Sequence, residues 1–162
     1  MTLPTLTGTS SEPQSVFDRL ITYKQENDIG DGDSSWLVID VDHRSKENIA
    51  TVCKTAREQG CQIAISNPCF EFWLFLHIFD VGDLPPRLYQ AEELQRSHDM
   101  KVALGSNYDF HHRPYHAFSG EVADAVRRAR NKEQGRSGLI PTFPGTDMYK
   151  VVESLPIKPP QS

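Results

Sequence analysis

Cysteine is scarce in this chain of 162 residues, which contains only Cys53, Cys61 and Cys69. No two of them form a Cys-x-x-Cys pair, so their spacing indicates neither a zinc knuckle nor a disulfide framework. A small, odd set of cysteines is typical of thiols in a reducing compartment. We therefore expect reduced, partly buried cysteines in a cytoplasmic protein.

Long hydrophobic runs are also missing. The first residues, Met1 to Thr5, lack the basic start and the apolar core of a signal peptide. The longest apolar segment, residues 70–79, contains Glu71 and His77 and is too short to span a bilayer. The sequence therefore predicts a protein without a membrane partner.

The glycine-rich and histidine-rich motifs of several enzyme classes do not occur either. The chain has no Walker loop, no Gly-x-Gly-x-x-Gly, no Gly-x-Ser-x-Gly and no His-Glu-x-x-His. We therefore do not expect this chain alone to hydrolyse nucleotides. The net charge of −5 argues against a basic nucleic-acid coat protein, but it leaves open a nuclease, which needs carboxylates at its centre.

What the sequence does contain is the composition of a globular protein. Hydrophobic residues make up 38% of the chain and charged residues 24%, which excludes a disordered chain and a fibrous repeat. A chain of this length buries roughly 68–70% of its unfolded surface, so it can form a real core. We expect a single domain over residues 1–162, with a disordered Pro-rich tail at 156–162.

Hydrophobic periodicity predicts alternating strands and helices. The strand at 36–42 is apolar on both faces, which is typical of a buried parallel strand. Ser45 is placed to cap the next helix, and Gly60 to end it. The order strand, helix, strand, helix indicates a right-handed βαβ unit and hence an α/β fold with a helical C-terminal part. The expected helices are 12–25, 45–60, 68–79, 88–95, 119–133 and 147–155, and the expected strands are 36–42 and 61–66.

Asp40 and Asp42 form the first candidate site. Residues two apart on a strand point to the same side and lie about 6.6 Å apart. Ligands of open α/β sheets bind beyond the carboxyl ends of parallel strands, which is where this pair falls. Two aspartates and a substrate phosphate could complete the oxygen shell of Mg²⁺ or Mn²⁺. The alternative is that both side chains only cap the following turn or face solvent.

Glu71 is the second candidate, because it stands alone in an apolar helix. Leu74, Phe75 and Ile78 share its face of the helix, where a charge is costly unless it is paired or bound to a metal. Its helix begins where the second strand ends, so we expect Glu71 and the aspartate pair to meet at one edge of the sheet. The alternative is a structural ion pair that anchors the helix.

Histidines and arginines supply weaker candidates. His77 lies about 120° from Glu71 around the helix, so we expect it not to share an ion with Glu71 and favour a hydrogen-bonded core histidine. The cluster at residues 111–116 contains His111, His112 and His116, which could bind a transition metal but lack a paired Cys/His element. The basic run at 127–132 favours a solvated helix face over a phosphate-binding one.

Three segments resemble a known family. Trp36-Leu-Val-Ile-Asp-Val-Asp42 and Ser66-Asn-Pro-Cys-Phe-Glu-Phe-Trp-Leu-Phe-Leu-His77 resemble the RloB-like family of restriction-associated, phage-defence proteins. Pro144-Gly-Thr-Asp-Met-Tyr149, with the residues that follow it to Leu155, resembles the C-terminal helix of that family. The likeness covers about residues 9–80 and 141–155 and leaves out 97–117.

The resemblance implies a Toprim-like fold, with a small, mostly parallel sheet flanked by helices. It also implies an abortive-infection role beside an ABC-type ATPase of the RloA type. Asp40 and Asp42 match the Mg²⁺-binding aspartate pair of Toprim domains. Ser66, Asn67 and His77 match the family signature together with Glu71, and we treat these three as candidate cofactor-binding residues.

The start of the chain departs from the family pattern. The family opens with a strand that ends in a Glu-Gly motif and with a further helix and strand, whereas residues 8–13 resemble a later turn. The Toprim glutamate therefore has no counterpart, since Thr7 would stand in its place and Glu12 is the only carboxylate nearby. We expect a domain that is short by one N-terminal βα unit and has an exposed or re-covered sheet edge.

Three functions follow from these observations. The first is a Mg²⁺-dependent phosphodiesterase acting on nucleic acid, with Asp40 and Asp42 holding the ion and Glu71 as a third carboxylate. The second is a non-catalytic or truncated subunit that acts by binding its ATPase partner, with self-association into a homo-oligomer also open. The third is a phosphotransferase with Asp40 as nucleophile and Asp42 as acid, although the rest of such a motif is missing.

Overall fold

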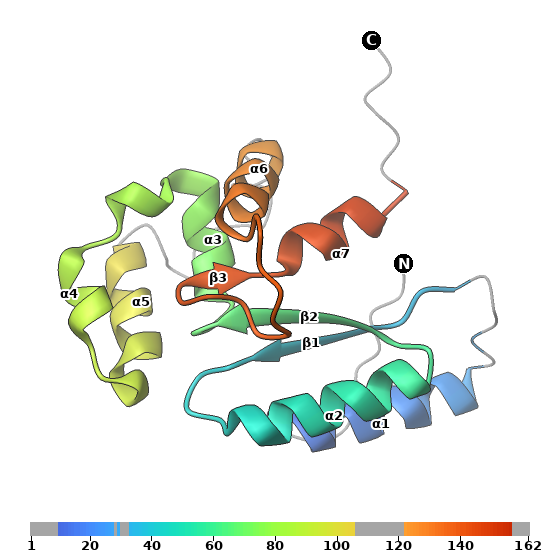
Figure 1. The fold of residues 1–162 in the computed structure, drawn as a ribbon. Coiled ribbons are helices and arrows are strands. Elements are labelled where there is room, and N and C mark those ends of the chain that lie inside the picture. Colours follow the sequence, from blue (N-terminus) through green and yellow to red (C-terminus); the bar gives the residue numbers. More distant parts are fainter. Residues whose placement is uncertain (1–9, 28, 30–32, 106–121, 157–162) are drawn as a thin grey trace, which may run out of the picture. The chain divides into compact units, whose positions relative to one another are not determined.

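The computed structural model describes residues 10–27, 29, 33–105 and 122–156 (Figure 1). The chain divides into two compact units. The first takes in the described residues up to Ile39 and from Arg44 to Ile63, and the second takes in Asp40–His43 and the described residues from Ala64 onward. The expected single domain over residues 1–162 stays a prediction, and residues 157–162 of the expected tail lie outside the described residues.

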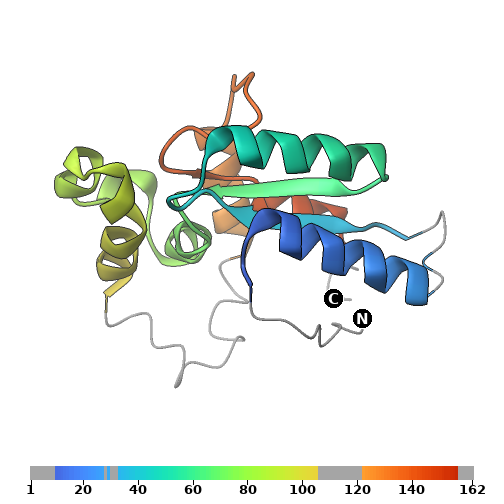
Figure 2. The same cartoon turned by 90° about the horizontal axis from the view of Figure 1, so that it is seen from below.

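The first unit is built around two helices that pack against each other, as Figures 1 and 2 show. The predicted cap is confirmed, because Ser45 Oγ accepts a hydrogen bond from the Asn48 amide at 3.2 Å. Gly60 follows the second helix with a φ of +74°, which explains the glycine at this stop. The elements of this part of the chain are α1 (Pro13–Glu26), β1 (Trp36–Asp40) and α2 (Lys46–Glu58).

The second unit is mainly helical. Its central helix, α3, contacts α5, α6 and β3, and α6 also contacts α7. The run expected to be a buried helix at 68–79 is shorter, because residues 68–70 form a turn before α3 begins. The elements are β2 (Gln62–Asn67), α3 (Glu71–Ile78), η1 (Val81–Asp83), α4 (Pro86–Gln90), η2 (Glu93–Gln95), α5 (Arg96–Leu104), α6 (Val122–Lys132), β3 (Gly145–Thr146) and α7 (Met148–Ser154).

The described strands form one sheet in the order β1-β2-β3. The Gln62 amide bonds the Ser35 carbonyl, and the Val41 amide bonds the Ser66 carbonyl. Paired positions thus advance together along both strands, so β1 and β2 are parallel, as the predicted βαβ unit requires. The α/β class expected from the sequence is confirmed.

The third strand was not predicted. β3 pairs antiparallel with β2, with Ser66 opposite Thr146 and Asn67 opposite Gly145. A strand of two residues is too short to produce a periodic pattern, so only its neighbour in space reveals it. The sheet therefore contains one parallel and one antiparallel pair among the described strands, rather than being mostly parallel.

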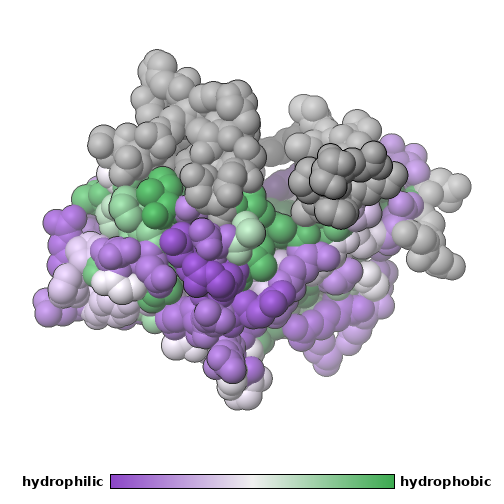
Figure 3. Space-filling view, turned by 90° about the horizontal axis from the view of Figure 1, so that it is seen from above, coloured by the Kyte–Doolittle hydropathy of each residue, from purple (hydrophilic) through white to green (hydrophobic). Residues whose placement is uncertain are grey.

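The core of the second unit is apolar and closely packed around α3. Phe72 and Leu76 are fully buried there, together with apolar side chains of α4, α5 and α6. Large exposed apolar side chains occur singly on several elements, and Figure 3 shows hydrophobic residues interspersed with hydrophilic ones on the face in view. Isolated exposure of this kind is normal for folded proteins.

None of the helices in the described part of the chain combines the length and the apolar character needed to cross a bilayer.

Gly145 lies in β3 at a point where a side chain has no room. A Cβ there would meet Glu133 Oε1 and would lie 2.5 Å from the Thr142 carbonyl oxygen and 2.9 Å from Pro141 Cβ. The carbonyl cannot swing away as a flexible side chain would. Gly145→Ala is therefore expected to lower the free energy of unfolding by about 1–3 kcal/mol, measured by urea denaturation.

Gly82→Ala is the matched control, because no atom lies within 4 Å of the Cβ it would add. We expect this control to change the free energy of unfolding by less than about 0.5 kcal/mol. Equal stability of the two variants would contradict the close packing described around β3.

Candidate functional site

The aspartate pair lies at the end of β1, but not with the geometry expected from a strand. β1 ends at Asp40, and Asp42 adopts a φ of 44° in the following turn. The expectation that both side chains extend from one strand face, two residues apart, is therefore wrong. A left-handed residue turns the chain, and the Asp42 amide bonds the Pro68 carbonyl at 2.7 Å. This bond ties the turn after β1 to the turn after β2.

Glu71 is the first residue of α3, and it is buried. Its carboxylate pairs with Lys101 of α5, with 3.7 Å between Lys101 Nζ and Glu71 Oε1. The lysine side chain is 54% exposed, whereas the glutamate side chain is only 11% exposed. An ion pair that anchors α3 is thus present, and the position at a helix start favours the anion further.

Cys69 is a buried thiol that lies two residues before Glu71. Burial raises the pKa of the Cys69 thiol, and the negative charges of Glu71 and Asp40 raise this pKa further. The thiol therefore stays protonated near neutral pH and is a poor nucleophile. The convergence of Asp40 and Glu71 at the carboxyl ends of β1 and β2 stays a prediction.

Three residues at this place were not found from the sequence. His43 Nδ1 lies 3.1 Å from Asp42 Oδ2. The Cys69 thiol donates to the backbone oxygen of Ser97, with 4.0 Å between Sγ and this oxygen. Lys101 follows one helical turn after Ser97 on α5. The segment from 97 onward has no clear apolar stripe, so neither its helix nor its approach to α3 was predictable from periodicity.

The side chains of Ser66 and Asn67 are engaged within the fold. Ser66 Oγ and Thr146 Oγ1 are hydrogen bonded at 2.8 Å, and both residues are buried. Asn67 Nδ2 donates to the Pro141 carbonyl at 2.8 Å. Both bonds hold the segment around β3 against β2, which gives these two signature residues a structural role; their cofactor-binding role stays a prediction.

His77 is buried near the end of α3. Its Nδ1 is hydrogen bonded to the Trp73 carbonyl at 2.9 Å, and its ring meets the Trp73 ring edge to face at 4.8 Å. This agrees with the interpretation of a hydrogen-bonded core histidine. His111, His112 and His116 lie outside the described residues.

The arginines of α6 are engaged by groups of α6 itself and of other elements of the second unit. Arg127 pairs with Asp124 at 2.9 Å, and Arg130 pairs with Glu153 of α7. Arg128 Nη1 donates to the Leu76 carbonyl at 2.7 Å, which fixes α6 to the end of α3. These contacts favour a structural role for the basic run over a phosphate-binding one.

A second group of charges is buried beside β3. Asp147 is 3% exposed, and its Oδ1 lies 2.6 Å from both Arg136 Nη2 and Lys150 Nζ. Glu133 Oε2 lies 2.9 Å from Arg136 Nη1, but the two are not aligned for a hydrogen bond. Burial raises the pKa of Glu133 despite the neighbouring arginine. Asp147 was expected only at the start of the last helix, so its role as the centre of a buried network is new.

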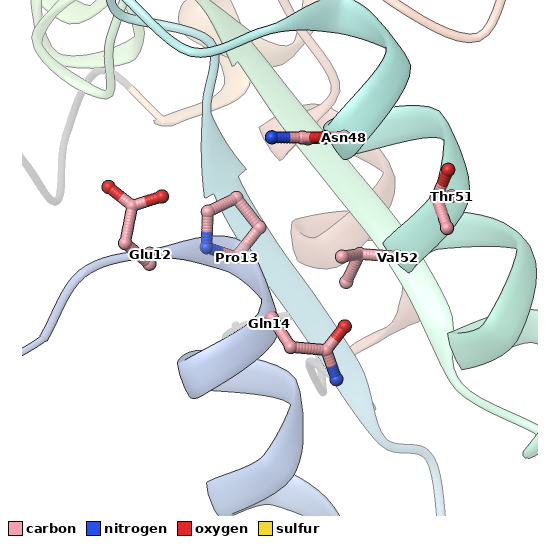
Figure 4. A pocket seen from close by; sticks show the side chains of 6 residues that line it. All are labelled: Glu12, Pro13, Gln14, Asn48, Thr51 and Val52. Atoms are coloured by element: carbon pink, nitrogen blue, oxygen red, sulfur yellow. The ribbon is translucent and has the colours of Figure 1, made fainter.

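The first unit contains a pocket of about 290 Å³. None of the buried charges beside β3 lines it. Figure 4 shows Glu12, Pro13 and Gln14 at the start of α1 facing side chains of α2. Glu12 Oε1 lies 3.9 Å from Arg44 Nε, and Arg44 Nη2 donates to the backbone and side-chain oxygens of Ser11 before α1. None of the candidate residues from the sequence lines this pocket.

The carboxylates suit a hard cation in their chemistry, since Mg²⁺ and Mn²⁺ prefer carboxylate oxygen to nitrogen or sulfur. Within the described ranges, however, no three side chains of His, Cys, Asp or Glu are grouped closely enough to hold a metal ion by themselves. An ion held by Asp40 and Asp42 would therefore have to take the rest of its shell from water and phosphate oxygens.

Comparison with known proteins places the chain in a family. The family model of RloB-like proteins matches residues 3–155, which is nearly the whole chain and includes the middle segment that the sequence motifs left out. No curated protein and no solved structure matches the chain significantly. Because the match covers most of the chain, the chain belongs to the RloB-like protein family.

Proposed function

We propose that this RloB-like protein is a phage-defence protein that binds Mg²⁺ at Asp40 and Asp42, with Glu71 as a further site residue, and cleaves a phosphodiester of nucleic acid. The observation that carries the proposal is the hydrogen bond from the Asp42 amide to the Pro68 carbonyl, which ties the turn that holds the aspartates to the turn that leads into α3 and Glu71. Carboxylates that are brought near one another repel unless a cation offsets their charge. Lys101 supplies one positive charge for Glu71.

The surroundings of each site residue indicate its role. Asp40 and Asp42 would hold the ion, which supplies a Lewis acid for the phosphate oxygens. Glu71, which is buried and paired, is suited to orienting a ligand rather than to exchanging protons with solvent. Cys69, whose pKa is raised by burial, would exclude water from the inner side of the site without reacting.

Cleavage of DNA and RNA by the purified chain tests this proposal. We expect cleavage that needs Mg²⁺ or Mn²⁺, stops with a chelator and falls to background in Asp40→Asn, because that carboxylate would be a metal ligand. Asp124→Asn, which removes an exposed carboxylate of α6, should cleave like the wild type. Cleavage that persists in Asp40→Asn would overturn the assignment of the site.

A second function has one observation in its favour. The described residues contain no group of three ligands for a metal, which suits a non-catalytic subunit that acts by binding an ABC-type ATPase. The absence of cleavage under all metal conditions, together with co-purification of the chain with such an ATPase, would favour this function over the first.

A further inference from the structure

We propose that Tyr89, Arg96 and Phe143 form a stacking platform that binds single-stranded nucleic acid, with a base stacked on it and a phosphate held by the arginine. This inference rests on the proposed function and narrows its substrate from nucleic acid in general to a strand with unpaired bases. It follows from the contacts among the three side chains, from the absence of a carboxylate partner for Arg96 among the described residues, and from the place of the platform in the second unit.

Phe143 is the centre of the stacking platform. The guanidinium carbon of Arg96 lies over the Phe143 ring, 4.3 Å from its centroid, and the Tyr89 ring meets the same ring edge to face at 6.2 Å. Tyr89 is 48% exposed, while Arg96 and Phe143 are partly buried. A guanidinium that lies over one aromatic ring can take a base on its other face, and an exposed tyrosine ring can stack on a base in the same way.

Arg96 carries a charge that no carboxylate of the described residues neutralises. Its Nε donates to the Ala91 carbonyl at 3.3 Å, whereas the arginines of α6 and Arg136 all pair with carboxylates. Neither Nη atom of Arg96 is among the buried unpartnered atoms of the described residues, so the side chain keeps donors at the surface. A partly buried cation without a counter-charge favours an anion, and a guanidinium can bind phosphate through two parallel hydrogen bonds.

The loop that carries Phe143 is held against the carboxyl end of β2. Asn67, the last residue of β2, donates from Nδ2 to the Pro141 carbonyl at 2.8 Å. Asn67 also pairs with Gly145 of β3, so both sides of Phe143 in the chain are fixed to the same strand end. Figures 1 and 2 show α4 and α5, which carry the other two residues of the platform, beyond this end of β2.

The start of α5 lies beside the turn that follows β2. The Cys69 thiol donates to the Ser97 carbonyl, with 4.0 Å between Sγ and this oxygen, and Ser97 directly follows Arg96. The Asp42 amide bonds the Pro68 carbonyl at 2.7 Å in the same turn. The stacking platform and the turn at Asp42 are thus both next to residues 68–69, so a strand held by the platform is placed beside the proposed reaction site.

The surroundings of the platform favour a single strand over a duplex. Unpaired bases offer their faces to aromatic rings and guanidinium planes, whereas the bases of a duplex are stacked on each other. Glu92 and Glu93 are exposed in the segment between Tyr89 and Arg96. A duplex carries a denser phosphate charge than a single strand, so these two carboxylates oppose a duplex more strongly.

Fluorescence anisotropy of a labelled DNA strand of about twelve nucleotides, titrated with the full chain at low salt and with a chelator, tests this inference. The chelator removes divalent ions, so neither cleavage nor a bound ion affects the readout. We expect Arg96→Ala to weaken binding at least about fivefold, because a stacking face and a charge-assisted hydrogen bond are lost. Tyr89→Ala should weaken binding at least about threefold, and the duplex of the same sequence should bind less tightly than the single strand. Binding of either this strand or its RNA counterpart supports the inference.

Arg57→Ala is the matched control, because it removes an exposed arginine of α2 and should leave binding unchanged. Thermal melting shows whether Arg96→Ala unfolds the protein, and in that case Arg96→Met, which keeps an apolar stem over Phe143, replaces it with the same expected loss. Equal affinity of the wild type and the folded Arg96 variant, or equal weakening in the Arg57 control, would overturn the inference. So would failure of the wild type to bind either strand, which is the outcome expected if this surface binds a protein instead. Binding that depends on Arg96 in a chain that cleaves nothing with Mg²⁺ would support the inference and overturn only the proposed cleavage.

Discussion

Replacement of Asp147 by alanine is expected to lower the free energy of unfolding by about 3–5 kcal/mol, because it leaves a buried cation without its partner. Asp147 is 3% exposed and lies directly after β3. Its carboxylate contacts Arg136 Nη2 and Lys150 Nζ, each at 2.6 Å, and accepts a hydrogen bond from the Ile65 amide at 3.4 Å.

The remaining partner cannot replace Asp147. Glu133 lies near Arg136, but neither of its carboxylate oxygens is aligned for a hydrogen bond, and burial raises the pKa of this group. The Arg136 side chain is only 12% exposed, so water would not solvate its charge once Asp147 is removed. The amide of Ile65 in β2 would lose an acceptor as well, so the effect reaches the sheet.

Equilibrium denaturation in urea measures this effect. Asp124→Ala serves as the control, because Asp124 also pairs with an arginine at 2.9 Å, but both side chains are more than half exposed. We expect this control to change the free energy of unfolding by less than about 1 kcal/mol. A difference between the two variants below about 1 kcal/mol would contradict the described role of Asp147.

Combined replacement of Asp40 and Asp42 by asparagine is expected to weaken Mn²⁺ binding by more than about tenfold. The substitutions keep the size of the side chains but remove two anionic ligands of a hard cation. The turn after β1 should persist, because Asn also tolerates the left-handed backbone found at Asp42 and the amide bond to Pro68 does not involve its side chain.

A charge-matched variant separates site binding from general attraction. Asp124→Asn with Glu153→Gln removes two carboxylates that pair with arginines of α6, and it should bind Mn²⁺ like the wild type. Glu71→Gln reports on the third carboxylate, and an intermediate loss of affinity is expected. Equal weakening in the double asparagine variant and in this control would show only a nonspecific charge effect.

Local patterns predicted much of the fold. Ser45 caps α2, and Gly60 follows its end with positive φ, because capping and left-handed backbone depend on neighbouring residues alone. The buried character of α3 also followed from its composition, since a helix that is apolar all round is buried.

What failed depended on contacts between distant residues. A hydrogen bond from the Asp42 amide to the Pro68 carbonyl holds the turn at Asp42, and no local pattern of the strand predicts this turn. β3 is defined only by its pairing with β2, across about eighty residues of chain. Lys101 reaches Glu71 from a helix without an apolar stripe, so its place in the candidate site could not be predicted from spacing.

The central claim is that Asp40 and Asp42 bind a divalent cation, and anomalous diffraction from crystals of the chain grown with Mn²⁺ tests it most directly. We predict an anomalous peak within ligand distance of both aspartate side chains and no such peak in the double asparagine variant. A structure at saturating Mn²⁺ with no peak at these residues, or with peaks only elsewhere on the protein, would contradict the claim.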